Sequence, residues 1–458
     1  AMKNNANVPN LNLRRLTTPM FIEQITGGLT SFTDILFLSM ISDQAAASVG
    51  MLSPILMLGY FILPQFTSAG TSVASQYMGA EQHDKVEPTW LANIVISTLI
   101  GTALSIAIFA VSGHAGLWLG MAADQNLYAS QYLSVIAFNF ILVGIRFSYA
   151  SILASKTLTR WTMVASVSTN LVNIPLNWAL MTGFWIFPRL GVRGIALATV
   201  ISYFIGFAIL FVMVHGKLHI DFLKESVIAG MRKVVAPIMR IGIPSMLEPF
   251  SYTVQNFVVS FLIIGLGLTA MGANTYANQL IFLDLTVSWV LASGGQILMS
   301  HHLGAGRIDA VKRTYRKIAI ICSAFAFLNV LVYVVFHRFF LGIFTHDPAI
   351  ERVGFWILLI LLFMEPIRSI NILGGVALKT VGDGKFSVIM GIAFMWGLVP
   401  VIVLATKLGC GIIGIWCCML ADETIRAGIN LWRWESGRWM GKTVIESADG
   451  DKPDAARV

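Results

Sequence analysis

Long apolar stretches recur along this 458-residue chain, each close to the length that crosses a bilayer as a helix. Short segments with charged residues or glycine separate them. We mark twelve stretches, at about 17–41, 49–77, 90–111, 124–145, 162–182, 191–214, 242–265, 270–300, 318–336, 351–372, 387–406 and 411–431. The pattern predicts an all-α integral membrane protein with twelve transmembrane helices.

The first part of the chain is repeated in the second part. Residues 19–86 align with residues 244–311 without a gap, so that Pro19 meets Pro244 and Glu23 meets Glu248. A later block repeats as well, since Ala154-Ser155-Lys156-Thr157 matches Ala377-Leu378-Lys379-Thr380. A duplicated half in a membrane protein is typical of transporters, whose substrate pathway lies between the halves.

The expected domain boundaries follow from this repeat. We expect an N-terminal six-helix bundle at 17–214 and a C-terminal one at 242–440, joined by a cytoplasmic linker with a short amphipathic helix at 215–241. Residues 1–16 form a cytoplasmic tail, and residues 441–458 form a tail that we expect to be disordered. Because each half has an even number of spans, both halves enter the membrane from the same side, which makes the repeat parallel.

Charge supports the membrane assignment and sets the orientation. Charged residues make up 12% of the chain and the mean hydropathy is +0.76, whereas soluble domains contain about 25% charged residues. Most of the 31 lysines and arginines fall on the side that holds the N-terminus, which the positive-inside rule assigns to the cytoplasm. We therefore predict a multi-pass protein of the bacterial inner membrane with both termini cytoplasmic. The net charge of +8 reflects this topology and contact with anionic lipids, not nucleic-acid binding.

Motifs of enzymes and of ATP-driven transporters are missing from the sequence. It contains neither a Walker A motif nor a His-Glu-x-x-His zinc motif. Three of the four cysteines fall within 410–418, a spacing that fits neither a zinc site nor a disulfide framework. The sequence therefore predicts a protein that is not an enzyme and that needs no cofactor.

Several motifs taken together resemble the multidrug and toxic compound extrusion (MATE) family, over about residues 12–440. They are Pro19…Asp34 in the first span, the Gly79-Ala80 and Leu303-Gly304-Ala305-Gly306 turns, Asn173-Ile174-Pro175-Leu176-Asn177 in the fifth span, Leu190-Gly191-Val192-Arg193-Gly194 before the sixth, and Gly242-Ile243-Pro244…Glu248 in the seventh. The resemblance implies two pseudo-symmetric six-helix bundles that form a V-shaped central cavity. It also implies export of small organic, often cationic, compounds by a monomer, driven by an influx of H⁺ or Na⁺.

Asp34 is the first candidate for the cation-coupling site. Ionisable residues inside a bilayer are costly and usually functional, and the repeat counterpart of Asp34 is Val259, so this acid breaks the symmetry of the two halves. The resemblance places Asn173, Asn177 and Thr199 beside it. Asn173 and Asn177 share one helix face. Their amide oxygens suit a hard cation such as Na⁺, although they serve equally well as hydrogen-bonding groups between helices.

Two symmetric ion pairs are a second hypothesis. Glu23 and Glu248 occupy equivalent repeat positions, and Arg146 and Arg368 nearly do. We therefore expect the pairs Glu23–Arg146 and Glu248–Arg368, one in each half. The alternative for the C-terminal half is that Glu365 pairs with Arg368 at i, i+3, which would leave Glu248 free.

Two departures from the family pattern favour H⁺ over Na⁺. The family often has Asp at the position of Asn177, and some relatives have an acid at the position of Arg368, so this chain lacks a carboxylate at each likely Na⁺ position. A Na⁺ site at Asp34, Asn173 and Asn177 remains the second choice. Asp284 is either a residue of the C-terminal half's cavity or a hydrogen-bonded interior acid.

A lipid-linked oligosaccharide flippase of the same wider superfamily is the alternative function. Such a flippase needs several cationic side chains to hold a pyrophosphate. Only Arg146 and Arg368 lie centrally in the predicted spans, which disfavours it.

Overall fold

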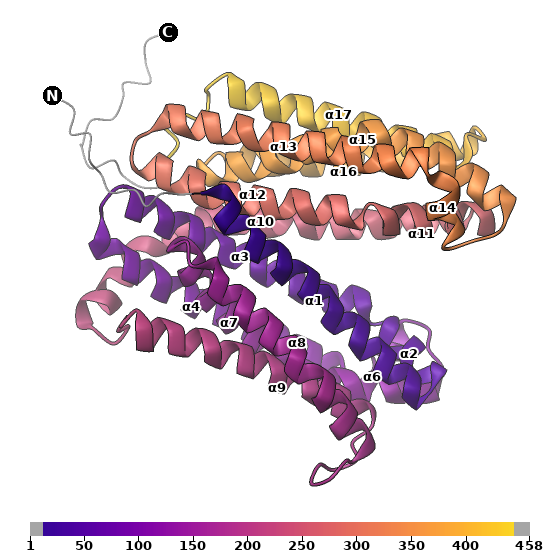
Figure 1. The fold of residues 1–458 in the computed structure, drawn as a ribbon, viewed down its shortest axis with the longest axis horizontal. Coiled ribbons are helices and arrows are strands. Elements are labelled where there is room, and N and C mark those ends of the chain that lie inside the picture. Colours follow the sequence, from indigo (N-terminus) through magenta and orange to yellow (C-terminus); the bar gives the residue numbers. More distant parts are fainter. Residues whose placement is uncertain (1–11, 444–458) are drawn as a thin grey trace. The chain divides into compact units, whose positions relative to one another are not determined.

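The computed structural model describes residues 12–443, and every regular element in that range is helical. Contacts divide the chain into two compact units, Ala1–Gly242 and Ile243–Val458. The boundary between them falls inside one 40-residue helix, α10 (Glu225–Ile264) (Figure 1). The C-terminal tail predicted to be disordered spans 441–458, and its residues 444–458 lie outside the described range.

The first unit is built from nine α-helices and a π-helical turn before it reaches α10. These elements are α1 (Leu13–Ile41), α2 (Asp43–Gly50), α3 (Ser53–Gly79), α4 (His83–Val111), α5 (Ala115–Trp118), α6 (Ala123–Ile136), α7 (Asn139–Ser155), α8 (Thr159–Thr182), α9 (Val192–Phe211) and η1 (Val212–Lys217).

The second unit begins in α10 and continues through seven further helices. They are α11 (Leu268–Leu280), α12 (Phe282–Gly304), α13 (Ile308–Val335), α14 (His337–Gly342), α15 (Pro348–Thr380), α16 (Gly384–Lys407) and α17 (Gly411–Glu435).

Every predicted apolar stretch coincides with one helix or with two consecutive helices. The fourth, at 124–145, covers α6 and the start of α7, which meet at a bend of 40°. The eighth, at 270–300, covers α11 and α12. The predicted linker at 215–241 differs most from the structure, because residues 225–241 form the first turns of α10 rather than a separate short helix.

Six of the described helices are long and apolar enough by themselves to cross a membrane, or up to eight spans if each bent pair is counted as one. The six are α4, α9 with η1, α12, α13, α15 and α16, and the bent pairs are α2 with α3 and α6 with α7. Helix α1 is too polar to be counted as a span in this way because it carries Glu23, Asp34 and several threonines.

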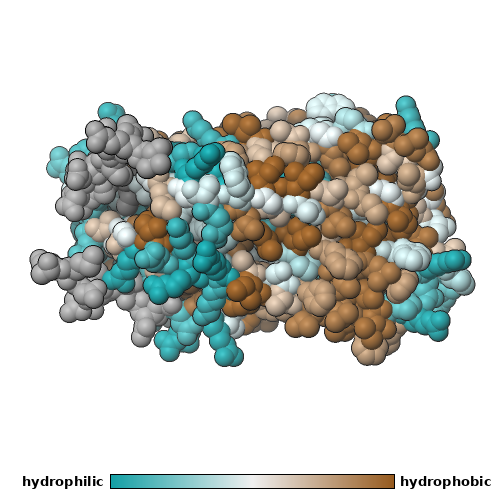
Figure 2. Space-filling view, turned by 90° about the horizontal axis from the view of Figure 1, so that it is seen from above, coloured by the Kyte–Doolittle hydropathy of each residue, from teal (hydrophilic) through white to brown (hydrophobic). Residues whose placement is uncertain are grey.

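Apolar side chains cover the middle of the helices on the outside of the protein. Figure 2 shows brown, hydrophobic residues along this stretch and teal, hydrophilic residues toward the ends. Leu99 on α4, Ile320 on α13 and Ile389 on α16 are among the large apolar side chains that are more than half exposed. Such exposure is costly in water and favourable in lipid.

Close helix packing in the first unit depends on glycine. A Cβ atom at Gly101 of α4 would lie 2.4 Å from the Phe140 carbonyl oxygen of α7, and one at Gly144 of α7 would lie 2.5 Å from the Ser97 carbonyl oxygen of α4. The two backbones can therefore approach only because both positions lack a side chain, as in many membrane helix pairs. Helix α8 packs between α1 and α9 (Figure 1).

Helix α15 is central to the second unit, where it packs against α11, α12, α13, α16 and α17. Its apolar residues Leu358 and Leu361 join Trp416 of α17 in a buried core. Past this core, α15 carries Glu365 and Arg368, and α17 carries Asp422, Glu423 and Arg426. The same packing that buries the leucines therefore also buries charged side chains.

Candidate functional site in the buried carboxylates

Asp34 lies on α1 at the centre of a polar cluster in the first unit. Its Oδ1 accepts a hydrogen bond of 2.8 Å from the Asn177 amide, and its Oδ2 accepts one of 2.7 Å from the Thr199 hydroxyl. Asn177 also donates to Asn173 Oδ1 at 3.0 Å, and Asn173 donates to Thr199 at 3.2 Å. The four residues that sequence reasoning grouped are thus in mutual contact, and only 5% of the surface of Asp34 is exposed.

The sequence explains why these groups meet. Asn173 and Asn177 are four residues apart on α8, so both amides leave the helix on the face that packs against α1. Thr199 lies on α9, the other neighbour of α8. Helix α1 contributes Thr33, whose hydroxyl lies 3.4 Å from Asn173 Oδ1.

One acceptor in this cluster is unused. Asn177 Oδ1 is buried and accepts no hydrogen bond within the described part of the chain. Buried polar atoms nearly always have a partner, so this oxygen marks a place where a cation or a proton donor fits. The carboxylate of Asp34 with the amide oxygens of Asn173 and Asn177 could hold Na⁺, and the carboxylate alone could hold H⁺.

Glu23 and Arg146 do not form the predicted ion pair. Glu23 Oε2 accepts a hydrogen bond of 2.8 Å from Thr162 on α8. The Arg146 guanidinium lies over the Tyr203 ring, 4.9 Å from its centroid, and its Nε has no hydrogen-bond partner among the described residues. Arg146 therefore packs against the aromatic side chain of α9 instead of reaching the carboxylate on α1.

Glu248 and Arg368 do not pair either. The Nζ of Lys379 lies 2.8 Å from Glu248 Oε2 and neutralises this acid. Arg368 instead contacts Glu365 at 2.6 Å, the alternative pairing at i, i+3, and lies 3.5 Å from Glu423. The prediction of Glu248–Arg368 is wrong because Lys379, the next-to-last residue of α15, contacts Glu248 instead.

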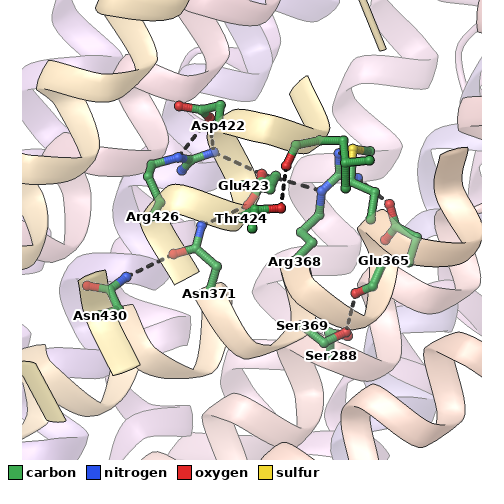
Figure 3. Close-up of polar contacts among 12 residues, drawn as sticks. Ser288, Glu365, Arg368, Ser369, Asn371, Asp422, Glu423, Thr424, Arg426 and Asn430 are labelled. Carbon is green, nitrogen blue, oxygen red and sulfur yellow. Dashed lines mark hydrogen bonds and ion pairs between the residues drawn. The ribbon is translucent and has the colours of Figure 1, made fainter. Parts of the chain in front are cut away.

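Five charged side chains of α15 and α17 form an alternating chain in the second unit (Figure 3). Glu365 contacts Arg368, and Glu423 lies between Arg368 and Arg426, with Arg426 at 2.9 Å. Arg426 also contacts Asp422 at 2.7 Å. We call these residues the α15–α17 charge chain. With three acids and two arginines, it carries one more negative than positive charge.

Two asparagines extend the charge chain at Glu423. Asn371 donates to Glu423 Oε2 at 2.8 Å, and Asn430 donates to Asn371 at 2.8 Å (Figure 3). The Ser288 and Ser369 hydroxyls lie 2.8 Å apart nearby, and Ser369 donates to the Glu365 carbonyl oxygen. Charges buried in this way are tolerated only when such partners satisfy them.

Asp284 is a separate buried acid at the start of α12. Its Oδ2 accepts a hydrogen bond of 2.9 Å from Asn329 on α13, and its Oδ1 has no partner among the described residues. No surface of Asp284 is exposed. Of the two roles expected for Asp284, this position agrees with that of a hydrogen-bonded interior acid.

Sequence reasoning missed Lys379, Asp422 and Glu423 as members of these sites. Lys379 belongs to the repeated block at 377–380, which was a usable signal, but its basic charge suggested the cytoplasmic surface. Asp422 and Glu423 precede Arg426 by four and three residues within the last apolar stretch, a spacing that favours intrahelical ion pairs.

A comparison with protein-family models agrees with the duplication and with the fold. The MatE model matches this chain twice, at residues 19–179 and 244–404. The two matches begin at Pro19 and Pro244, the first aligned residues of the internal repeat. The chain belongs to the MATE family.

Relatives of this MATE transporter match almost its whole length. YisQ of Bacillus subtilis (strain 168), an uncharacterized transporter, is 28% identical over 434 residues, covering 94% of this chain and 95% of that protein. A probable multidrug resistance protein NorM of Thermotoga maritima is 24% identical over 440 residues, covering 94% of each.

Solved structures also match this chain over almost its whole length. The crystal structure of MATE in the bent conformation has a TM-score of 0.83 at 18% identity, covering 93% of this chain and 94% of that one. A MOP-superfamily transporter from Pyrococcus furiosus, whose reversed pocket polarity suggests a different function for that protein, has a TM-score of 0.80 at 19% identity, covering 94% and 96%.

These similarities settle the class of protein. The MATE transporter described here is an all-helical, multi-pass membrane protein whose fold has about twelve helical spans. It is a transporter and not an enzyme. MATE transporters are coupled to ions and bind small organic substrates. Helices α1 and α17, which do not pass as spans by composition alone, each carry charged groups of the site.

Proposed function

We propose that this MATE transporter is a secondary antiporter of a bacterial inner membrane. It exports small organic, often cationic, compounds in exchange for H⁺, with Na⁺ as the second choice of coupling ion. The observation that carries the proposal is the buried carboxylate of Asp34, which two neutral side chains hydrogen-bond and no cationic side chain contacts among the described residues. Binding a proton or another cation removes the energetic cost of holding this negative charge inside the membrane.

The neighbours of Asp34 can serve both of its charge states. When the carboxylate is ionised, Asn177 and Thr199 donate to its two oxygens. When it is protonated, its O–H needs an acceptor, and rotation of the Asn177 amide supplies the oxygen that is now unused. The unused Asn177 oxygen therefore gives the protonated form of Asp34 a hydrogen-bond acceptor that the ionised form does not need.

Alternating access turns this exchange into transport. Asp34 takes up a proton while the site faces outward. When the site faces the cytoplasm, Asp34 releases the proton and the substrate can bind. One charge moving down a potential of 100 mV supplies about 2.3 kcal/mol, before any chemical gradient. The protein supplies the switch, and the ion gradient supplies the driving force.

The substrate class rests on the relatives and on composition. NorM proteins among the relatives are described as multidrug resistance proteins. The chain contains 29 phenylalanines and 20 methionines, side chains whose soft, adaptable surfaces suit varied apolar cations. We expect the transporter to act as a monomer among membrane lipids.

A flippase for lipid-linked oligosaccharides receives less support from the same geometry. Its pyrophosphate would need free cationic side chains, whereas Arg368 and Arg426 are both held by carboxylates. Arg146 is left without an ion pair among the described residues, and a single arginine is a weak site for a pyrophosphate.

The test is efflux of a fluorescent organic cation from proteoliposomes, with a pH gradient and a Na⁺ gradient imposed separately. We expect the pH gradient alone to drive transport by the wild type, and Asp34→Asn to abolish it. Asp124→Asn, at an exposed acid at the start of α6, is the matched control and should behave as wild type. Transport driven only by Na⁺ would overturn the ion assignment. Failure of both gradients, with Asp34→Asn unchanged, would overturn antiport itself.

A further inference from the structure

Side-chain contacts join α1 to α8 along one continuous line. From one end to the other, the contacts are Glu23 with Thr162, Thr26 with Ser166, Thr30 with Asn170, Thr33 with Asn173, and Asp34 with Asn177. Spacings of three and four residues keep these groups on facing sides of the two helices. We call this line the α1–α8 polar seam.

The seam begins at one carboxylate and ends at another. Glu23 and Asp34 are eleven positions apart on α1, which at a rise of about 1.5 Å per residue separates them by about 16 Å along the helix. Glu23 lies toward the end of α1 that carries the N-terminus, the end predicted to be cytoplasmic. The seam therefore extends from the candidate coupling site at Asp34 in the direction in which a proton must leave.

Glu23 lacks the partner that its repeat counterpart has. In the second unit, Lys379 contacts Glu248 at 2.8 Å. In the first unit, the equivalent Lys156 lies over the Trp90 ring at 5.2 Å instead. Arg146 is engaged with Tyr203, so Glu23 has no ion pair among the described residues. A half-buried carboxylate in a membrane helix that no cationic side chain contacts among the described residues is suited to exchange a proton.

We propose that Glu23 is a second proton-binding carboxylate of this transporter, and that protons bound at Asp34 leave toward the cytoplasm through it. The inference rests on the proposed H⁺ antiport. In the transfer, one O–H bond breaks at Asp34 and one forms at Glu23, with water between the seam's hydroxyl and amide groups carrying the proton. The seam supplies the hydrogen-bond partners that hold this water in a helix interface.

Charged and titratable groups face both ends of the seam. Arg146 of α7 is the charged group near Glu23. Tyr60 of α3, Tyr132 of α6 and Tyr203 of α9 are the tyrosines that interact electrostatically with Asp34. Two acids and one arginine leave this region with one negative charge in excess, so a single proton neutralises it. The seam thus shares one proton between two carboxylates.

The test compares two activities of the same reconstituted protein. The first is dye efflux driven by a pH gradient, and the second is exchange of labelled for unlabelled dye at equal pH, which needs no net proton movement. For Glu23→Gln we expect gradient-driven efflux to fall by about tenfold or more, with exchange close to wild type. Glu23→Asp should restore part of the efflux. Thr30→Val, which interrupts the seam without changing charge, should show the same split.

Glu225→Gln, at an exposed acid in the first turn of α10, is the matched control and should leave both activities unchanged. Equal losses of efflux and exchange in Glu23→Gln and Thr30→Val would indicate a structural role and overturn the proposal. Efflux by Glu23→Gln at the wild-type rate would also overturn the role proposed for Glu23. If Asp34→Asn is inactive in the same experiment, the antiport proposal still stands. If the pH gradient does not drive the wild type, the antiport proposal itself fails.

Discussion

The ammonium of Lys379 lies 2.8 Å from the carboxylate of Glu248, and 6% and 21% of these side chains are exposed. The pair joins α15 to α10 within the second unit. Both residues have repeat counterparts, Lys156 and Glu23, which do not contact each other in the described structure. A duplicated pair of positions therefore has an ion pair in one copy and, among the described residues, a carboxylate without an ion pair in the other.

Removing the lysine of this pair should destabilise the second unit. Lys379→Met leaves the half-buried Glu248 without its ion-pair partner, which costs up to about 3–5 kcal/mol, the value for a fully buried pair. Thermal unfolding of the purified protein in detergent would measure the loss. Adding Glu248→Gln should recover most of the stability, because the uncompensated charge disappears. Lys385→Met, at an exposed lysine of α16, is the control, and a Lys379→Met protein as stable as this control would contradict the ion pair.

Double-mutant cycles should separate the two pairings that the sequence left open for Arg368. The cycle of Glu365→Gln with Arg368→Met should give a coupling energy of about 0.5–3 kcal/mol, since the two groups are 2.6 Å apart. The cycle of Glu248→Gln with Arg368→Met should give a clearly smaller value. Unfolding in detergent is again the measurement. The reverse order of the two coupling energies would show that Arg368 pairs with Glu248 after all.

A second carboxylate at Asn177 should change the ion that the site binds. Asn177→Asp places two carboxylates where the Asn177 amide now contacts Asp34 at 2.8 Å. Carboxylate oxygens are strong ligands of hard cations, so we expect Na⁺ to raise the melting temperature of the variant and to leave the wild type nearly unchanged. K⁺ at equal ionic strength is the control. No Na⁺-specific shift in the variant would mean that the cluster is too small or too rigid for Na⁺.

Side chains added at the contact of α4 with α7 should prevent close packing. Gly144→Ala would place a methyl group 2.5 Å from the Ser97 carbonyl oxygen, and Gly101→Ala would place one 2.4 Å from that of Phe140. Overpacking of this kind costs about 1–3 kcal/mol. Gly28→Ala on α1, where nothing lies within 4 Å, should be neutral. Melting temperatures and monodispersity in detergent provide the readout, and equal melting temperatures for the three variants would contradict the packing.

The candidate site was predictable in one half and not in the other. In the first unit the asymmetry of Asp34 and Val259 singled out the acid, and the resemblance to the MATE family placed beside it the asparagines and the threonine that contact it in the structure. In the second unit several carboxylates of the same bundle could pair with Arg368, and the sequence gives no distance to any of them. Which one it contacts depends on the rotation of α15 and α17 about their axes, and a rotation of one residue redirects a side chain by about 100°.

The sequence by itself determined the helical class, the duplicated halves and the position of nearly every helix, because lipid requires long apolar segments whose backbone is hydrogen-bonded internally. It also singled out Asp34, whereas the other members of its cluster were expected from the resemblance to the MATE family. Only the tertiary structure decided that Lys379 neutralises Glu248, that Arg146 stacks on Tyr203, and that Glu423 lies between two arginines. Apolar length is a property of a single segment, whereas an ion pair depends on how two segments pack, and several partners of similar chemistry compete for each charge.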